Sequence, residues 1–120
     1  MGSEFTKPTA SAKAFFESLV GDLPDVLVRP MFGHLSAFVN GNMFSGFFGD
    51  HVFVRLDEED RTELLRVPGA STFAPMPGRA MKEYVNFPAA WRGEPRRARP
   101  WVEKSLAWAR TLPPKKKSER

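Results

Sequence analysis

The side chains that could do chemistry in this sequence are few and lie far apart along the chain. The two histidines, His34 and His51, have no second ligand-type residue at the spacing of a helix turn or a hairpin. A zinc or two-histidine iron site needs more ligands than the chain supplies near either of them. Asp50 and His51 complete a triad on paper with Ser36 or Ser45, but no nucleophile elbow surrounds either serine. The sequence therefore predicts no metal, no cofactor and no enzymatic activity.

The four consecutive acids at residues 57–60 have the composition of a metal-binding cluster. They also open the segment LDEEDRTELLRV, in which Asp57 stands in the N-cap position of a short helix. Carboxylates in the first turn of a helix are stabilised by the positive end of the helix dipole. We interpret this run as the start of a helix that Pro68-Gly69 ends.

The segment FAPMPGRAMKEYVNF, residues 73–87, gathers two prolines, a glycine and several charged groups. Pro77-Gly78 suits the central positions of a type II turn, because proline presets a negative φ and glycine takes the positive φ that follows. The chain has no GxxxxGK[ST] loop, and this glycine precedes a predicted strand rather than a helix. We therefore predict a turn between two strands and no phosphate-binding loop.

Glu83 is the residue of this segment that a plain turn does not explain. Period-two alternation places it in a row with Met81, Val85 and Phe87, and a carboxylate in an apolar row needs a partner. The candidate partners are the arginines Arg29, Arg55 and Arg79. We expect a structural ion pair, with Arg79 and Glu83 contributing to stability rather than to catalysis.

The elements that must position these residues alternate between strand and helix periodicity. The apolar segments of HLSAFVNGNMFSGFFGDHVFVRL are divided by NG and GD, which are typical of tight hairpin turns. The predicted elements are a helix at residues 10–20, strands at 34–39, 43–48 and 51–56, a short helix from Asp57, strands at Phe73 and 81–87, and a helix at 96–112. This α-β(3)-α-β(2)-α order predicts an α+β fold, an antiparallel sheet with flanking helices.

Prolines and capping residues refine these boundaries. Pro30 interrupts the apolar run at residues 26–31, which is therefore a weaker strand candidate. Pro100 is acceptable in the last helix only within the first turn. Thr9 or Ser11 supplies the N-cap of the first helix.

The predicted strands are apolar on both faces if each hairpin turn has two residues. One face then carries Leu35, Ala37, Val39, Phe44, Phe48 and Phe53, and the other carries Phe38, Met43, Phe47, Val52, Val54 and Leu56. An antiparallel sheet usually keeps one face solvated. The candidate interface is the second face, through Phe38, Met43, Phe47, Val52 and Val54. The partner expected there is a second copy of the chain, which makes a homodimer.

The positive charge of the chain is concentrated near its C-terminal end. Residues 92–120 hold ten basic and three acidic residues, whereas residues 1–91 hold eight basic and eleven acidic ones. Clustered cations release counterions from phosphates, so the candidate contacts to nucleic acid are Arg96, Arg97, Arg99, Lys115, Lys116 and Lys117. The alternative is a solvated basic tail. Trp101 and Trp108 have helical spacing and are assigned to the core rather than to base stacking.

Length and composition predict a single domain. MGSEF at residues 1–5 is typical of a cloning remnant, residues 6–112 form the domain, and residues 113–120 form a basic disordered tail. The chain has no cysteine, which agrees with a reducing cytoplasm. No apolar run approaches the roughly 18 residues of a membrane span. We expect a cytoplasmic protein without a membrane segment.

Three segments carry a family resemblance: RPMFGHLSAFVNGNMFSGFFGDHVFVRLDEEDRTELL, FAPMPGRAMKEYV, and the closing helix that ends in ARTLPPK. Together they resemble the TfoX N-terminal domain family, named after the bacterial competence regulator TfoX, also called Sxy. The motif residues are Arg29, Met31, Phe32 and Gly33 in the first segment and Pro77, Gly78 and Arg79 in the second. The resemblance implies the same α-β(3)-α-β(2)-α order, a fold similar to secretion chaperones, and a non-catalytic regulatory role in bacteria.

Two departures separate this sequence from the competence regulators. His34 stands where family members often have a second glycine, and the C-terminal helical domain of the full regulators is not in this sequence. The resemblance therefore does not by itself transfer the competence function.

The predicted function is that of a regulatory or protein-interaction domain with a transcription-related protein partner. One alternative is weak nucleic-acid binding through the basic C-terminal segment. Another is a small-ligand-binding or enzymatic domain with a pocket near Arg29, His51, Arg79 and Glu83. Convergence of these four side chains in a deep pocket favours the ligand alternative, and a flat apolar sheet face favours a protein partner.

Overall fold

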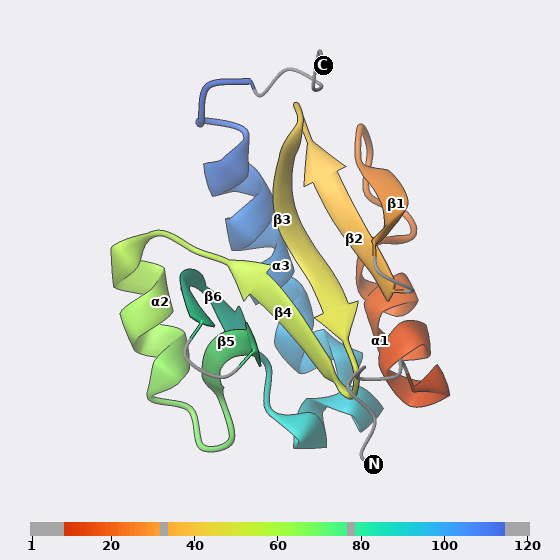
Figure 1. The fold of residues 1–120 in the computed structure, drawn as a ribbon, viewed down its shortest axis with the longest axis vertical. Coiled ribbons are helices and arrows are strands. Elements are labelled where there is room, and N and C mark those ends of the chain that lie inside the picture. The colour runs from red at the N-terminus through yellow and green to blue at the C-terminus, as the bar shows by residue number, and fades with distance from the viewer. Residues whose placement is uncertain (1–8, 32–33, 77–78, 115–120) are drawn as a thin grey trace.

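The fold is an antiparallel sheet with its helices packed against one side (Figure 1). The computed structural model describes residues 9–31, 34–76 and 79–114. Its elements are α1 (Ala10–Val20), β1 (Leu27–Met31), β2 (His34–Val39), β3 (Asn42–Phe48), β4 (His51–Arg55), α2 (Glu58–Leu65), β5 (Ser71–Met76), β6 (Arg79–Asn86), the 3₁₀ helix η1 (Ala89–Gly93) and α3 (Pro95–Ala109). The predicted α+β class is confirmed.

The sheet has one strand more than the sequence predicts. Its six strands follow the order β1-β2-β3-β4-β6-β5, and all neighbours are antiparallel. The additional strand is β1, which forms in spite of Pro30 and places four strands before α2. A proline is tolerated at a sheet edge, because the N–H that it lacks can be one that faces solvent. The 3₁₀ helix η1 is also absent from the prediction.

The predicted caps and the first hairpin turn are confirmed. The Thr9 side chain accepts a hydrogen bond from the backbone N–H of Ala12, and the Asp57 side chain accepts one from Asp60. Asn40 and Gly41 have φ angles of 51° and 81°, as a type I′ turn requires. These three local signals therefore act as the sequence alone indicates.

The position of Pro100 is a correction. The last helix, α3, begins at Pro95, so Pro100 lies beyond the first turn and inside the helix. The helix persists because Val102 and Leu106 on its opposite side are buried in the core. Burial of these side chains offsets the hydrogen bond that Pro100 cannot make to the carbonyl of Arg96.

A bulge in β3 overturns the predicted strand faces. Ala37 pairs with Ser45 and Phe38 with Met43, so Phe44 is an extra residue that has no partner in β2. One inserted residue reverses the alternation of everything that follows it. Two side chains predicted on the first face, Phe48 and Phe53, lie on the second. Four side chains predicted on the second face lie on the first, buried: Phe47, Val52, Val54 and Leu56.

The main core lies between the sheet and the helices. In Figure 1, β3 and β4 cross in front of α3. The core includes Phe15, Phe16 and Leu19 from α1, Val54 from β4, Leu64 from α2, and Val102 and Leu106 from α3. All three helices thus bury side chains on one side of the sheet. We call the opposite side the open face.

No helix within the described residues is long and apolar enough to cross a bilayer.

Candidate functional site

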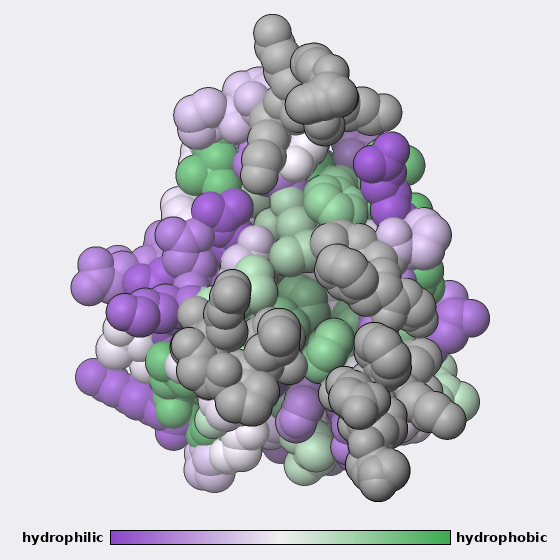
Figure 2. Space-filling view, viewed as in Figure 1, coloured by the Kyte–Doolittle hydropathy of each residue, from purple (hydrophilic) through white to green (hydrophobic). Residues whose placement is uncertain are grey.

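The open face is centred on an aromatic cluster formed by Phe53, Phe73 and Tyr84. Phe53 stacks on Phe73 with ring centroids 4.2 Å apart, and Tyr84 meets Phe53 edge-on at 5.6 Å. Half-buried Met43, Phe48 and Met81 pack against the cluster. Phe38, also half-buried, pairs with Met43 across β2 and β3. Figure 2 views the molecule from this side and shows apolar residues gathered at the centre of the face. The three rings are buried, and offset and edge-on ring contacts of this kind stabilise their packing beneath the half-buried side chains.

Gly46 allows the aromatic cluster to lie flat on the sheet. It pairs with Phe53 across β3 and β4 and with Ser36 across β2 and β3. A Cβ atom at Gly46 would stand 2.8 Å from Phe53 Cζ and 2.8 Å from Ser36 Oγ. The Phe53 ring therefore occupies the space that any larger side chain at this position would need.

Two polar side chains are buried at the border of the open face. His34 is 4% exposed and stacks on Phe48 at a centroid distance of 4.8 Å. Asn86 is 6% exposed and donates from Nδ2 to Ser71 Oγ over 3.2 Å. Its Oδ1 atom is buried and has no hydrogen-bond partner among the described residues. Both groups are polar but almost completely covered, so they contribute little to the surface of the open face.

At the end of β4, Glu83 has an arginine partner, as the sequence predicts, but the predicted apolar row is wrong because the Glu83 side chain is 48% exposed. Arg55 Nη2 lies 2.6 Å from Glu83 Oε1, which makes Arg55 the partner among the three candidate arginines. The Arg55 guanidinium also lies 5.8 Å from the Tyr84 ring centre and 5.4 Å from that of Trp108. Arg55 therefore joins the open face to the end of α3.

Burial raises the pKa of Tyr84 above its usual value of 10.0; the positive charge of Arg55 acts in the opposite direction, and the carboxylate of Glu83 adds to the increase. The Tyr84 hydroxyl donates to the backbone oxygen of Met43 over 3.3 Å. A neutral phenol that donates to a carbonyl is a packing residue at neutral pH rather than a base.

Arg29 and Glu83, two of the four residues proposed for a ligand pocket, lie too far apart to line one pocket together. Arg29 is on β1 and Glu83 is on β6, with β2, β3 and β4 between them. Four strand spacings of about 4.8 Å place these two strands about 19 Å apart. His51 is exposed where the β3–β4 turn ends. The Arg79 side chain lies outside the described part of the structure. The predicted pocket is therefore wrong for Arg29 and Glu83.

Ser45, one of the two serines proposed for a catalytic triad, does not form one. The Ser45 hydroxyl is fully buried and donates to the backbone oxygen of Phe53 over 2.8 Å. Asp50 forms an ion pair with Arg92. The His51 side chain is exposed. The hydroxyl and the carboxylate are thus engaged in structural interactions.

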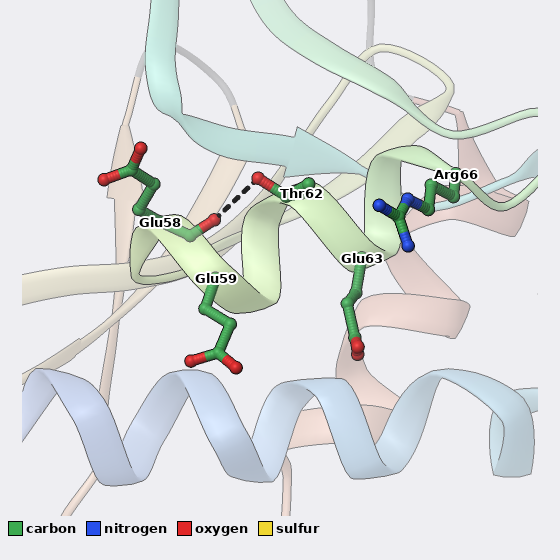
Figure 3. A pocket seen from close by; sticks show the side chains of 5 residues that line it. All are labelled: Glu58, Glu59, Thr62, Glu63 and Arg66. Carbon is green, nitrogen blue, oxygen red and sulfur yellow. Dashed lines mark hydrogen bonds between the residues drawn. The ribbon is translucent and has the colours of Figure 1, made fainter.

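The acidic run at residues 57–60 opens α2, as predicted. A hollow of about 480 Å³ lies against the outer side of this helix and is lined by Glu58, Glu59, Thr62, Glu63 and Arg66 (Figure 3). Glu59 and Glu63 project to the same side of the helix, and Thr62 donates to the Glu58 carbonyl over 2.9 Å. Within residues 9–31, 34–76 and 79–114, no three His, Cys, Asp or Glu side chains are grouped to hold a metal ion.

Two of the six cations proposed for nucleic-acid contact are already paired with acids of the same chain. Arg97 lies 3.5 Å from Glu94, and Arg99 lies 3.0 Å from Asp22. Arg96 is exposed and has no ion pair in the described part of the chain. Lys115, Lys116 and Lys117 lie outside the described residues, as do Phe32, Gly33, Pro77 and Gly78 of the family motifs.

Each tryptophan has a cation of the same chain near its ring. Arg97 lies 5.3 Å from the Trp91 ring centre and Lys104 lies 5.4 Å from that of Trp101, in addition to Arg55 at Trp108. Trp91 is buried, and Trp101 and Trp108 are half-buried. The three rings are therefore packing residues, as the helical spacing of the last two predicts.

The sequence does not reveal the members of the aromatic cluster, for two different reasons. Alternation across two-residue turns predicts Phe48 and Phe53 on the first face, which the β3 bulge reverses. For Phe73 and Tyr84 the sequence predicts strands but no face. Gly46 offered one signal, because glycine inside a strand often marks a close approach of another group.

The chain matches the family model of the TfoX N-terminal domain over residues 18–109, which confirms the predicted resemblance. No curated protein and no solved structure matches it. The matched region extends from the second half of α1 to the last residue of α3 and includes every strand of the sheet. The TfoX N-terminal domain family is not a known enzyme family. The chain belongs to the TfoX N-terminal domain family.

Proposed function

We propose that this protein is a non-catalytic regulatory domain that acts by binding another protein through its open face. The observation that carries this proposal is a second apolar cluster on the side of the sheet opposite the three helices, with half-buried Met43, Phe48 and Met81 packed against the buried rings of Phe53, Phe73 and Tyr84. Family membership supports a regulatory, competence-related role. The partner proposed is a transcription-related protein in the bacterial cytoplasm.

The side chains that could act in catalysis are already held in hydrogen bonds or ion pairs, which argues against a catalytic role. Ser45 donates to Phe53, Asp50 is paired with Arg92, and Glu83 is paired with Arg55. A general acid or base must be free to exchange a proton with a substrate. The open face instead carries half-buried Met43, Phe48 and Met81, whose apolar side chains suit an apolar segment of a protein partner.

A capture experiment with paired variants tests this function. Phe38→Asp and Met43→Asp place a charge on half-buried positions of the open face, and Leu65→Asp places one on exposed α2 as the control. We expect the wild-type protein and Leu65→Asp to retain a transcription-related protein from a bacterial extract, and both open-face variants to lose it. Equal retention by all four proteins, with circular dichroism showing that all are folded, would contradict the proposal.

A further inference from the structure

We propose that two copies of this chain pair through their β1 strands, so that their sheets join edge to edge. Among the described strands, β1 has only one neighbour, β2, and is therefore an edge of the sheet. Leu27 is 53% exposed and Val28 is 40% exposed. Among the described residues they are two of three exposed large apolar side chains, and the third, Leu65, is on α2. Two of these three exposed apolar side chains thus lie on one edge strand of the sheet.

Pro30 determines which backbone groups β1 presents outward. In an antiparallel ladder, alternate residues direct both N–H and C=O toward one neighbour. Pro30 pairs with Leu35 but has no N–H to donate to β2. The hydrogen bonds to β2 therefore run through Leu27, Arg29 and Met31, and Val28 directs its N–H and C=O away from the sheet.

This pattern matches a second copy of the same strand in one register. If Val28 faces Val28 of the second copy, each donates its N–H to the carbonyl of the other around a two-fold axis. Pro30 contributes only its C=O to this ladder, and its missing N–H prevents the pairing from being centred on Pro30 itself. Leu27 then lies opposite Arg29 of the second copy, and the two arginines do not face each other.

Charge complementarity favours the antiparallel second copy over a parallel strand. Arg29 and Asp25 are both exposed, and neither forms an ion pair within the described residues. Asp25 lies in the turn that leads into β1. Antiparallel pairing brings Arg29 of each copy toward the Asp25 turn of the other. A parallel arrangement would place the two copies of Arg29 side by side instead.

The two-fold axis of this dimer is perpendicular to the sheet, so both open faces lie on the same side of one continuous sheet. The pairing therefore leaves the open face of each copy free. The dimer does not depend on the proposed function, and each can fail without the other.

Single cysteines test the register directly, because the chain has no cysteine of its own. Val28→Cys places two thiols on facing residues, where the Cα separation of about 5.5 Å permits a disulfide. Leu27→Cys is the register control, since the two copies of residue 27 would be about 8 Å apart and beyond disulfide reach. Leu65→Cys is the exposure control, because its exposure equals that of Val28.

We expect mild oxidation to convert Val28→Cys to a covalent dimer at least ten times faster than either control. Equal rates for Val28→Cys and Leu27→Cys would overturn the register, and the proposal with it. Faster cross-linking of Leu65→Cys would place the contact on α2 and would also overturn it.

Sedimentation velocity of the full chain tests the surface independently. We expect a dimer for the wild-type protein and for Leu65→Asp, and a monomer for Val28→Asp with an unchanged circular dichroism spectrum. Met81→Glu, on β6 at the far side of the open face, should remain a dimer. A wild-type monomer at all concentrations up to the solubility limit would overturn the proposal. Dissociation by Met81→Glu but not by Val28→Asp would also overturn it, in favour of the open face.

Discussion

Gly46 sets how closely the Phe53 ring approaches the centre of the sheet. A Cβ atom at this position would be 2.8 Å from Phe53 Cζ and 3.1 Å from the backbone oxygen of Leu35. The ring is stacked on Phe73 and cannot withdraw without opening the aromatic cluster. We expect Gly46→Ala to lower the free energy of unfolding by about 1–3 kcal/mol, the usual cost of overpacking. Urea denaturation followed by tryptophan fluorescence measures this change.

Gly93→Ala is the matched control for this substitution. A Cβ atom at Gly93 would meet nothing within 4 Å. We expect its urea midpoint to stay at or above that of the wild-type protein. A loss of stability at Gly93 as large as that at Gly46 would show that backbone freedom, and not the Phe53 contact, is what glycine supplies.

Tyr84 is the only tyrosine of the chain, so its ionisation can be followed without interference from another phenol. Burial raises its pKa in the folded protein above the usual value of 10.0. The unfolded chain therefore loses this proton first as the pH rises. The stabilisation is complete below pH 10 and is lost as the pH rises through the folded-state pKa.

We expect tyrosinate absorbance to appear with a midpoint above 10 in the native protein and near 10 in urea. The free energy of unfolding should decrease with pH in the same range, and Tyr84→Phe should remove that part of the dependence. A native midpoint at or below 10 would contradict the burial of the phenol.

At the scale of elements, Pro100 destabilises α3 because it lies inside the helix. This residue is exposed, so its ring contributes little to the core. It removes one helix hydrogen bond and crowds the carbonyl of Arg96. Pro100→Ala should raise the free energy of unfolding by about 2 kcal/mol, after allowance for the greater freedom of the unfolded chain. Thermal unfolding by circular dichroism measures the gain.

Pro95→Ala provides the comparison within the same helix. Pro95 is the first residue of α3, where a missing N–H would have no partner in any case. We expect no gain in melting temperature from this substitution. A similar increase for both alanine variants would point to proline-specific effects in the unfolded chain and not to strain in the helix.

Local sequence signals predict most helices and strands correctly, but they do not predict the bulge in β3. Thr9, Asp57 and the Asn40-Gly41 turn act within a few residues, so the sequence around each is sufficient to recognise it. The bulge at Phe44 depends on distant contacts, because Ser105 of α3 donates a hydrogen bond to the Phe44 carbonyl over 3.0 Å. Alternation within β3 cannot reveal a contact with a residue 61 positions away.

The candidate site could not be assembled from the sequence for the same reason. Arg55 was a candidate partner of Glu83, but the choice among three arginines required the pairing of β4 with β6. The aromatic cluster draws on β4, β5 and β6, and its composition followed only once the faces of these strands were known. The family motifs identified the fold without indicating which surface is used.

At the scale of the whole molecule, internal ion pairs reduce the positive field available to a nucleic acid. Arg92, Arg97 and Arg99 are each paired with an acid of this chain. If the nucleic-acid alternative holds, affinity must come chiefly from Arg96 and the lysines at residues 115–117. Binding to a random duplex should then weaken steeply with salt, and a chain ending at Pro113 should show a slope smaller by about 3, one for each lysine lost.

A variant in which Lys115, Lys116 and Lys117 are all replaced by Gln controls for chain length. It should behave as the truncated chain does. Equal slopes for all three proteins, or no binding at low salt, would leave the segment as solvated charge.

The order of the strands also divides the molecule into two folding units. β1 to β4 are joined by hairpins between sequence neighbours, and β5 with β6 forms a second hairpin. The two units meet where β4 pairs with β6 through three residue pairs. In sequence, α2 connects the first unit to the second. Local hairpins close small loops at little entropic cost, so each unit can form before β4 pairs with β6. In native-state hydrogen exchange, the amides that bond β4 to β6 should therefore exchange together. The free energy of this opening should be lower than that of unfolding the four-stranded unit. The aromatic cluster joins β4 to β5 and β6. A partner bound over it would therefore contact both folding units and raise the free energy needed to separate them.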